Sequence, residues 1–152
     1  MRRFLSLARV NIGGRLIAAG VLVGCMTPLV LAAGLNAEAD GHGTHEQLGL
    51  PACSVKMYTD YPCPSCGMTT AFAHAADGRV LAAFAVQPAG AMLALIAAVA
   101  AWVSLYALVS GARLGPWLTR LWDEWRAWIV LALLLLIFGS WAYTTSLAAA
   151  GH

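Results

Sequence analysis

Three of the four cysteines in this 152-residue sequence are grouped in one short stretch. Cys53 is followed by Cys63 and Cys66, which form the motif Cys-Pro-Ser-Cys-Gly with two residues between them. Two thiolates at this spacing, on a turn relaxed by the glycine, can bind one tetrahedral metal ion such as zinc. The same spacing suits a disulfide, or a reactive thiol pair at a helix start, where the helix dipole favours thiolate. Spacing alone leaves these three chemistries open.

A metal site built on the three cysteines leaves one coordination position for another ligand. His42 and His45 lie in the polar, glycine-rich stretch before Cys53, and either is a candidate for the fourth ligand. His74 fits badly, because eight residues of helix separate it from Cys66, which is about 12 Å at the α-helical rise. In the redox alternative, Cys63 attacks a client, Cys66 resolves the mixed disulfide and Cys53 shuttles to or from the client.

A line of polar side chains continues from the motif along the next predicted helix. At about 100° per residue, Cys66, Thr70, His74 and Asp77 fall within roughly 80° of arc. The surrounding residues are mostly alanine, methionine and phenylalanine. Thr70, His74 and Asp77 therefore either line a small polar pocket, with Asp77 orienting His74, or simply form the wet face of an interfacial helix.

These residues must be positioned by elements that cross a membrane. Leu16–Leu35, Pro88–Val109 and Ala127–Leu147 contain no charged residue, and each approaches the roughly 20 apolar residues of a transmembrane helix. The whole chain is 61% hydrophobic and only 11% charged. The sequence thus predicts an all-α membrane protein with about three transmembrane helices and short extracytoplasmic interfacial helices after a cysteine-rich loop.

The arginines predict the orientation of these helices. Seven basic residues flank the predicted cytoplasmic ends, and only Lys56 and Arg79 lie in the long segment after the first span. This excess predicts a multi-pass protein of the bacterial inner (cytoplasmic) membrane with a cytoplasmic N-terminus and an extracytoplasmic cysteine block. The predicted single membrane domain has these parts: cytoplasmic 1–15, first span 16–35, outer loop 36–67, interfacial or re-entrant helices 68–87, second span 88–109, cytoplasmic interfacial segment 110–126 and third span 127–147.

The first span also resembles processed segments. Leu22-Val23-Gly24-Cys25 has the form of a bacterial lipobox, and Ala37-Glu38-Ala39 resembles a signal-peptidase site. We expect a retained span, because the apolar run extends ten residues beyond Cys25. Cleavage at Cys25 or after Ala39 is the alternative.

The cysteine block resembles a known signature. Residues 62–72, Pro-Cys-Pro-Ser-Cys-Gly-Met-Thr-Thr-Ala-Phe, are similar to the Cys-Pro-x-Cys-Gly-x-Thr-Arg-Ala block of the bacterial DUF2752 membrane protein family, and Cys53 to the cysteine that precedes it. Gly78 is similar to the glycine that follows the block, and Ala83 with Pro88 to an Ala-x3-Asn-Pro element. Thr70 and Gln87 depart from the arginine and asparagine of the pattern. The resemblance implies a small multi-span architecture and no known activity, because the family is defined without one.

The sequence contains no catalytic triad, phosphate-binding glycine loop or paired carboxylates. We therefore favour a non-enzymatic accessory or scaffold protein whose cysteine block is stabilised by a metal ion or a disulfide. The alternatives are a membrane thiol–disulfide oxidoreductase and a transporter or channel component. The expected partners are the lipid bilayer and another membrane protein that packs on small-residue helix faces, such as Gly20 with Gly24. With a net charge of +2 and no basic stripe, no nucleic-acid partner is expected.

Overall fold

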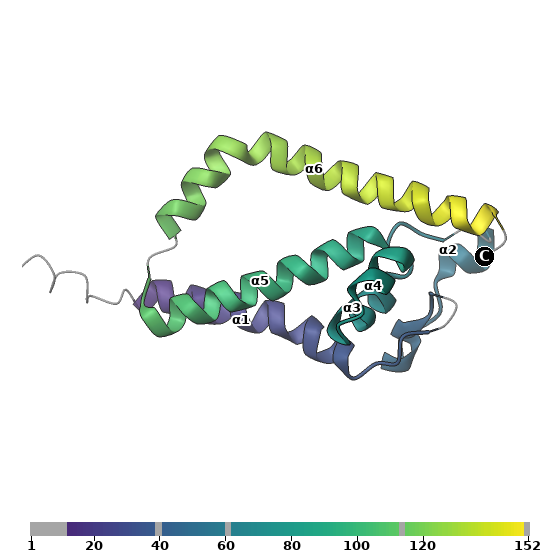
Figure 1. Cartoon of the computed structure of the whole chain (residues 1–152), viewed down its shortest axis with the longest axis horizontal. Coiled ribbons are helices and arrows are strands. Elements are labelled where there is room, and N and C mark those ends of the chain that lie inside the picture. The colour runs from purple at the N-terminus through teal and green to yellow at the C-terminus, as the bar shows by residue number, and fades with distance from the viewer. Residues whose placement is uncertain (1–11, 39–40, 60–61, 113–114, 151–152) are drawn as a thin grey trace, which may run out of the picture.

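The computed structural model describes residues 12–38, 41–59, 62–112 and 115–150, and these residues form helices and no strands (Figure 1). In chain order the elements are α1 (Ile12–Ala33), the 3-10 helix η2 (Thr44–Leu48), α2 (Ser54–Thr59), α3 (Met68–Ala76), α4 (Val80–Val86), α5 (Pro88–Ser110) and α6 (Gly115–Ala149). The predicted all-α architecture is confirmed.

Three helices are long and apolar enough to cross a membrane. They are Ile12–Ala33, Pro88–Ser110 and Trp122–Ala149, with mean hydropathies of 2.3, 2.3 and 2.0. Large apolar side chains on their outer faces are exposed, among them Ile17, Trp102 and Leu135. Exposure of so many large apolar side chains to water is unfavourable, whereas contact with the hydrocarbon chains of a bilayer is favourable. The chain is therefore an all-α membrane protein with three candidate spans.

Small residues let α5 lie close to its neighbours. Helix α5 packs along α1 and against α3 and α4, and Ala71, Ala83 and Ala91 form the fully buried centre of this contact. A Cβ atom on Gly90 of α5 would lie 3.0 Å from the Cβ atom of Ala71 and 3.2 Å from the Cα atom of Met68. The N-terminus of α3 is thus held against the N-terminus of α5 by a contact that only glycine permits.

Helices α3 and α4 form a short pair between α1 and α5. Helix α3 ends at Ala76, Gly78 takes the left-handed conformation at φ 76°, and α4 begins at Val80. This break at Asp77-Gly78 divides the segment of residues 68–87 into two short helices. The Arg79 guanidinium donates to the Asp77 carboxylate at 2.6 Å beside the break.

Residues 115–149 form one continuous helix in the structure. For this region the sequence predicts an interfacial segment followed by a span beginning at residue 127, whereas the candidate span in α6 begins at Trp122. The charges of Asp123, Glu124 and Arg126 weaken hydropathy there but do not oppose helix formation, which explains the difference. Helix α6 runs beside α5 and contacts it little, and its C-terminal half meets the cysteine-bearing end of the molecule (Figure 1).

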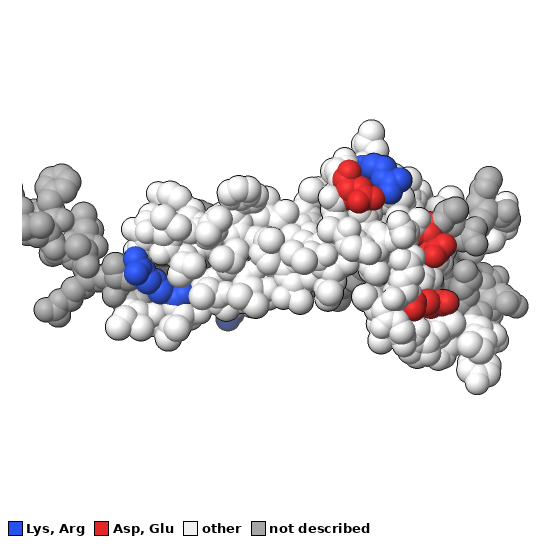
Figure 2. All heavy atoms as spheres, turned by 90° about the horizontal axis from the view of Figure 1, so that it is seen from below, with Lys and Arg blue, Asp and Glu red and all other residues white. Residues whose placement is uncertain are grey.

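Charged side chains lie at the two ends of the molecule. In the face seen in Figure 2, blue and red atoms occupy the ends, and a long uncharged zone separates them. Arg15 lies in the first turn of α1, and Asp77, Arg79 and Glu38 lie beyond its far end or beside α3 and α4. A belt without charges between two charged ends is the pattern expected of a bilayer-spanning protein.

Candidate metal centre

The Cys-Pro-Ser-Cys-Gly motif forms a tight turn that leads into α3. The Cys66 amide donates to the Cys63 carbonyl at 2.9 Å, and the Met68 amide donates to the Ser65 carbonyl at 3.1 Å. The Cys63 thiol and the Ser65 hydroxyl are 3.3 Å apart and share a hydrogen bond. These bonds bring the two cysteines of the motif to one side of the turn.

Gly67 allows the turn to end in a helix. It precedes α3 with φ at +85°, the left-handed region that favours glycine. A Cβ atom here would lie 3.0 Å from the Gly41 carbonyl oxygen and 3.2 Å from Cγ1 of Val86. Both the backbone conformation and the space therefore require glycine directly after Cys66.

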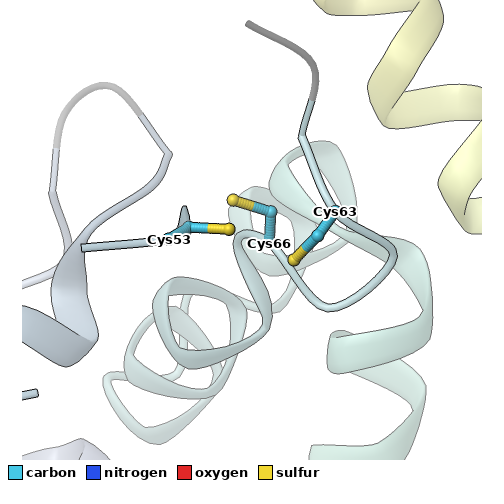
Figure 3. A group of neighbouring side chains, drawn as sticks. All are labelled: Cys53, Cys63 and Cys66. Atoms are coloured by element: carbon cyan, nitrogen blue, oxygen red, sulfur yellow. The ribbon is translucent and has the colours of Figure 1, made fainter. Parts of the chain in front are cut away.

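Cys53 joins the motif from a separate segment. It lies directly before α2, and its carbonyl accepts from the Met57 amide at 3.0 Å. The Sγ atoms of Cys53, Cys63 and Cys66 all lie within 4.8 Å of one another. Figure 3 shows the three side chains converging from two chain segments. None of the four cysteines, all of which the structure describes, forms a disulfide.

The separation of the sulfur atoms suits a metal ion. Zinc–sulfur bonds of about 2.3 Å at tetrahedral angles place two sulfur ligands roughly 3.8 Å apart. Sulfur atoms within 4.8 Å reach that arrangement by closing about 1 Å or less. Cys66 is buried, and Cys53 and Cys63 are half-buried, so the group is shielded on one side. The residues present therefore fit a thiophilic metal ion.

The electrostatics of the group depend on what neutralises it. Burial, together with the charges of Cys63 and Cys53, raises the pKa of the Cys66 thiol from 9.0 to about 11. Without a cation, Cys66 is therefore a protonated thiol at neutral pH and a poor nucleophile. A bound divalent cation reverses this balance, because a coordinated thiol loses its proton.

A cavity of about 350 Å³ lies against the cysteines. Its wall includes all three of them, and His45 faces it from η2. The remaining lining residues come from the residue before η2, the cysteine turn and the start of α3: Gly43, Ser65, Gly67, Met68, Thr69 and Thr70. Both the cysteine group and an imidazole thus border the same space.

A side chain of one candidate span and the residue that caps another hold the carbonyls on either side of Cys63. The Trp141 indole Nε1 of α6 donates to the Pro62 carbonyl at 3.1 Å. The Gln87 amide Nε2, at the start of α5, donates to the Pro64 carbonyl at 3.0 Å. Proline lacks an amide hydrogen, so this segment has few backbone donors of its own, and its carbonyls are free for such contacts. The backbone around Cys63 is thereby fixed to the membrane-spanning helices.

Gln87 also completes the N-terminus of α5, whose first amides have no partner within the helix. Its Oε1 accepts from the Gly90 amide at 2.6 Å, and its carbonyl accepts from the Ala91 amide at 3.1 Å. The Ala89 amide donates to the Ser140 hydroxyl of α6 at 3.2 Å, and Pro88 has no amide hydrogen to satisfy. The fully buried Gln87 side chain thus joins the cysteine turn to the end of a span.

The predicted polar line divides in the structure. Thr70 is buried, lines the cavity and shares a 2.8 Å hydrogen bond with Thr44 of η2. Asp77 pairs with Arg79 instead of approaching the cavity. His74 lies between them with its Nδ1 atom buried and, in the described residues, unbonded. Burial, with a further contribution from Arg79, lowers the pKa of His74 below 6.5, and Asp77 opposes this shift.

The two loop histidines differ in position. His45 lines the cavity, and its Nε2 atom lies 3.2 Å from the Pro51 carbonyl oxygen. His42 is half-buried and is not among the described residues that border the cavity. Cys25 lies within α1, far along the sequence from the group, and Ala39 lies outside the described residues.

Sequence reasoning missed the residues that support the site. Gln87 entered only as a departure from a family pattern, Trp141 only as part of a span, and Thr44 not at all. The one available signal for Gln87 was a polar residue before a proline that opens an apolar run, which is where a helix cap is expected. The contacts of Trp141 and Thr44 join residues 79 and 26 positions apart, and no local pattern marks them.

Comparison with known proteins gives one similarity. The model of a family described as a protein of unknown function (DUF2752) matches residues 53–102. The match begins at Cys53 and includes the cysteine motif, α3, α4 and much of α5. None of the curated proteins and none of the solved structures matches the chain.

Proposed function

We propose that the chemistry of residues 53–102, the segment that is similar to the DUF2752 family and contains the whole cysteine group, is metal binding. In this proposal the protein is a multi-pass, non-enzymatic membrane accessory or scaffold. Cys53, Cys63 and Cys66 hold one zinc ion, and the ion fixes the loop that carries them. The fixed loop is the surface presented to a partner.

One observation carries this proposal. Three sulfur atoms from two chain segments lie within 4.8 Å of one another at the end of the candidate spans. A structural bridge uses only two sulfur atoms, whereas one tetrahedral zinc ion binds up to four. The metal therefore accounts for the third cysteine as well as the pair. Zinc is preferred over harder divalent ions because thiolate is a soft ligand.

The orientation of the loop is part of the proposal. The excess of basic residues near the opposite ends of the spans supports a cysteine end outside the cytoplasm of a bacterial inner membrane. Thiols there are exposed to oxidation, and a bound metal protects them from it. A reporter enzyme that folds to an active form only outside the cytoplasm, fused after residue 59, tests this orientation. The fusion is expected to be active.

A partner helix in the membrane is also proposed. Cβ atoms added to Gly20 and Gly24 of α1 would meet nothing within 4 Å, whereas Gly90 of α5 is closely covered. The small-residue face of α1 is thus accessible for close approach by another helix. Exchange of both glycines for leucine is expected to abolish co-purification of a partner without changing the metal content.

Thiol–disulfide exchange is the second candidate, and the proximity of the sulfur atoms supports it. Cys63 would attack a disulfide of a client, releasing one client thiol, and Cys66 would then attack the mixed disulfide and release the second. The client is reduced by two electrons, and Cys63 and Cys66 are oxidised to a disulfide. The raised pKa of Cys66 opposes the resolving step, because the attacking species is the thiolate.

Metal analysis and thiol counting on one preparation distinguish the two candidates. The full chain is purified in detergent without reductant, and zinc per chain and alkylatable thiols after denaturation are measured. The proposal predicts one zinc and no disulfide, and the loss of zinc in Cys63→Ser but not in Cys25→Ser, the matched control. A preparation with a Cys63–Cys66 disulfide and no zinc would overturn it and favour exchange.

A further inference from the structure

The cysteine group leaves the fourth position of a tetrahedral site to be filled, and η2 brings a histidine to the same cavity. Both loop histidines precede Cys53, but only His45 is among the described residues that line the cavity of about 350 Å³. Since the three cysteines line it as well, the imidazole and the sulfur atoms border one space.

The segment that carries His45 is anchored to α3. Thr44 is fully buried, accepts from the Glu38 amide at 3.2 Å and shares a 2.8 Å hydrogen bond with Thr70. Gly43 and Gly49, both with positive φ, bound the helical turn at its two ends. Because Thr70 lies in the first turn of α3, which begins directly after the cysteine turn, the bond ties the His45 segment to the helix that follows the cysteines.

The hydrogen bond of His45 determines which ring nitrogen is available. The Pro51 carbonyl oxygen can only accept, so His45 Nε2, which lies 3.2 Å away, carries the hydrogen and donates it. In a neutral imidazole the other nitrogen, Nδ1, then has the lone pair. A histidine that binds a metal through one nitrogen almost always donates the other N–H to a carbonyl, a carboxylate or water. Pro51 also stands two residues before Cys53, so this bond connects the two segments of the site.

Charge favours the same ligand. Three thiolates on a divalent ion leave a net charge of −1. A neutral imidazole completes the tetrahedron without adding negative charge, whereas a fourth anionic ligand would add to it. The three sulfur atoms form the close group by themselves, so metal binding must draw His45 inwards.

We propose that His45 is the fourth ligand and that it binds through Nδ1, giving a Cys3His zinc site in which Pro51 accepts from Nε2. This inference rests on the proposed metal site and assigns its last ligand, which lies outside the segment that the family model matches. The site thereby closes the loop of residues 41–53 onto the cysteine turn.

Cobalt substitution and two matched variants test the assignment. The full chain, purified in detergent, is stripped of metal and loaded with Co²⁺, and zinc affinity is measured by competition with a chromophoric chelator. His45→Ala is expected to weaken zinc binding roughly 100-fold or more and to shift the ligand-field bands of Co²⁺, because loss of a ligand exceeds the 10- to 100-fold cost of an outer contact. His42→Ala, on the same loop, is expected to behave as wild type. His45→Cys is expected to restore tight binding with stronger sulfur-to-cobalt charge transfer.

The possible outcomes separate this inference from the function on which it rests. If wild type binds neither zinc nor Co²⁺ tightly, the metal site itself is refuted. If wild type binds zinc and Co²⁺ tightly but His45→Ala has the same affinity and spectrum as wild type, only the assignment of His45 as fourth ligand is refuted. That assignment is also refuted if His42→Ala alone changes the affinity or the spectrum. Nitrogen-15 NMR of the histidine rings in the zinc-bound wild type needs no variant. Coordination at Nδ1 of His45 supports the inference, and coordination at Nε2 or no coordination overturns it.

Discussion

Replacing Gln87 separates the support of the cysteine turn from the capping of α5. In Gln87→Leu both polar contacts of this fully buried side chain are lost at nearly constant volume. In Gln87→Asn the cap to the Gly90 amide is kept, because asparagine is among the best N-cap residues. The shorter side chain withdraws its amide by about 1.5 Å, so the 3.0 Å bond to the Pro64 carbonyl is broken.

The expected magnitudes follow from the two contacts. Leaving a buried donor or acceptor unpaired costs about 1–3 kcal/mol for each group. Gln87→Leu orphans the Gly90 amide and the Pro64 carbonyl, so we expect a destabilisation of about 2–4 kcal/mol after partial relaxation. Gln87→Asn orphans the carbonyl alone, and about 1.4 kcal/mol is expected. If that energy holds Cys63 in its binding position, zinc affinity falls about tenfold.

Zinc affinity and stability are measured on the same three proteins. Affinity comes from chelator competition in detergent, and stability comes from thermal unfolding of the metal-free forms. We expect Gln87→Asn to lower the affinity and to lower the unfolding temperature by less than Gln87→Leu, which lowers both. Wild-type affinity in Gln87→Asn would refute the idea that this bond positions the cysteine turn.

Three further predictions concern neighbouring residues. Trp141→Phe removes the hydrogen bond to the Pro62 carbonyl and should lower the free energy of thermal unfolding by about 0.5–1.5 kcal/mol. It should also speed the alkylation of Cys63 in the metal-free protein. An unchanged alkylation rate would show that this hydrogen bond does not hold the segment around Cys63. Gly67→Ala combines a positive φ with a 3.0 Å approach to a carbonyl oxygen and should lower the free energy of unfolding by about 2–4 kcal/mol. Gly49→Ala, which has a positive φ in open space, should lower it by about 1 kcal/mol. Equal losses in the two variants would contradict the packing argument. The pKa of His74 is lowered from 6.5, so the unfolded chain binds more protons than the folded chain as pH falls below 6.5. The unfolding temperature should therefore drop below pH 6.5 and stay level above pH 6.5. His74→Gln should reduce this dependence of the unfolding temperature on pH.

The spans were predictable because their signal is carried by composition. A run of about 20 uncharged residues has one physical explanation whatever its neighbours are, and Pro88 marks the start of α5 in both the sequence and the structure. The break at Asp77-Gly78 was predictable for a similar reason, since glycine there permits the positive φ of 76°. The start of α6 was less so, because charged residues lower hydropathy without ending a helix.

The support of the site was not predictable because it depends on contacts between distant residues. The Cys-Pro-Ser-Cys-Gly motif predicts that its own two thiols lie close together. The position of Cys53 beside them depends on how the loop of residues 41–53 returns to α3. Gln87, Trp141 and Thr44 act through single hydrogen bonds to backbone or hydroxyl groups, and such partners leave no periodic trace in the sequence. Two of these partners are the backbone carbonyls of Pro62 and Pro64, which a sequence motif does not mark as acceptors.

X-ray absorption at the zinc edge, on the full chain purified in detergent without reductant, tests the central claim most directly. Joint coordination by Cys53, Cys63 and Cys66 predicts a first shell of three sulfur atoms at about 2.3 Å with one lighter atom at about 2.0 Å. A shell of nitrogen and oxygen atoms only, or a protein that contains no zinc, would contradict it.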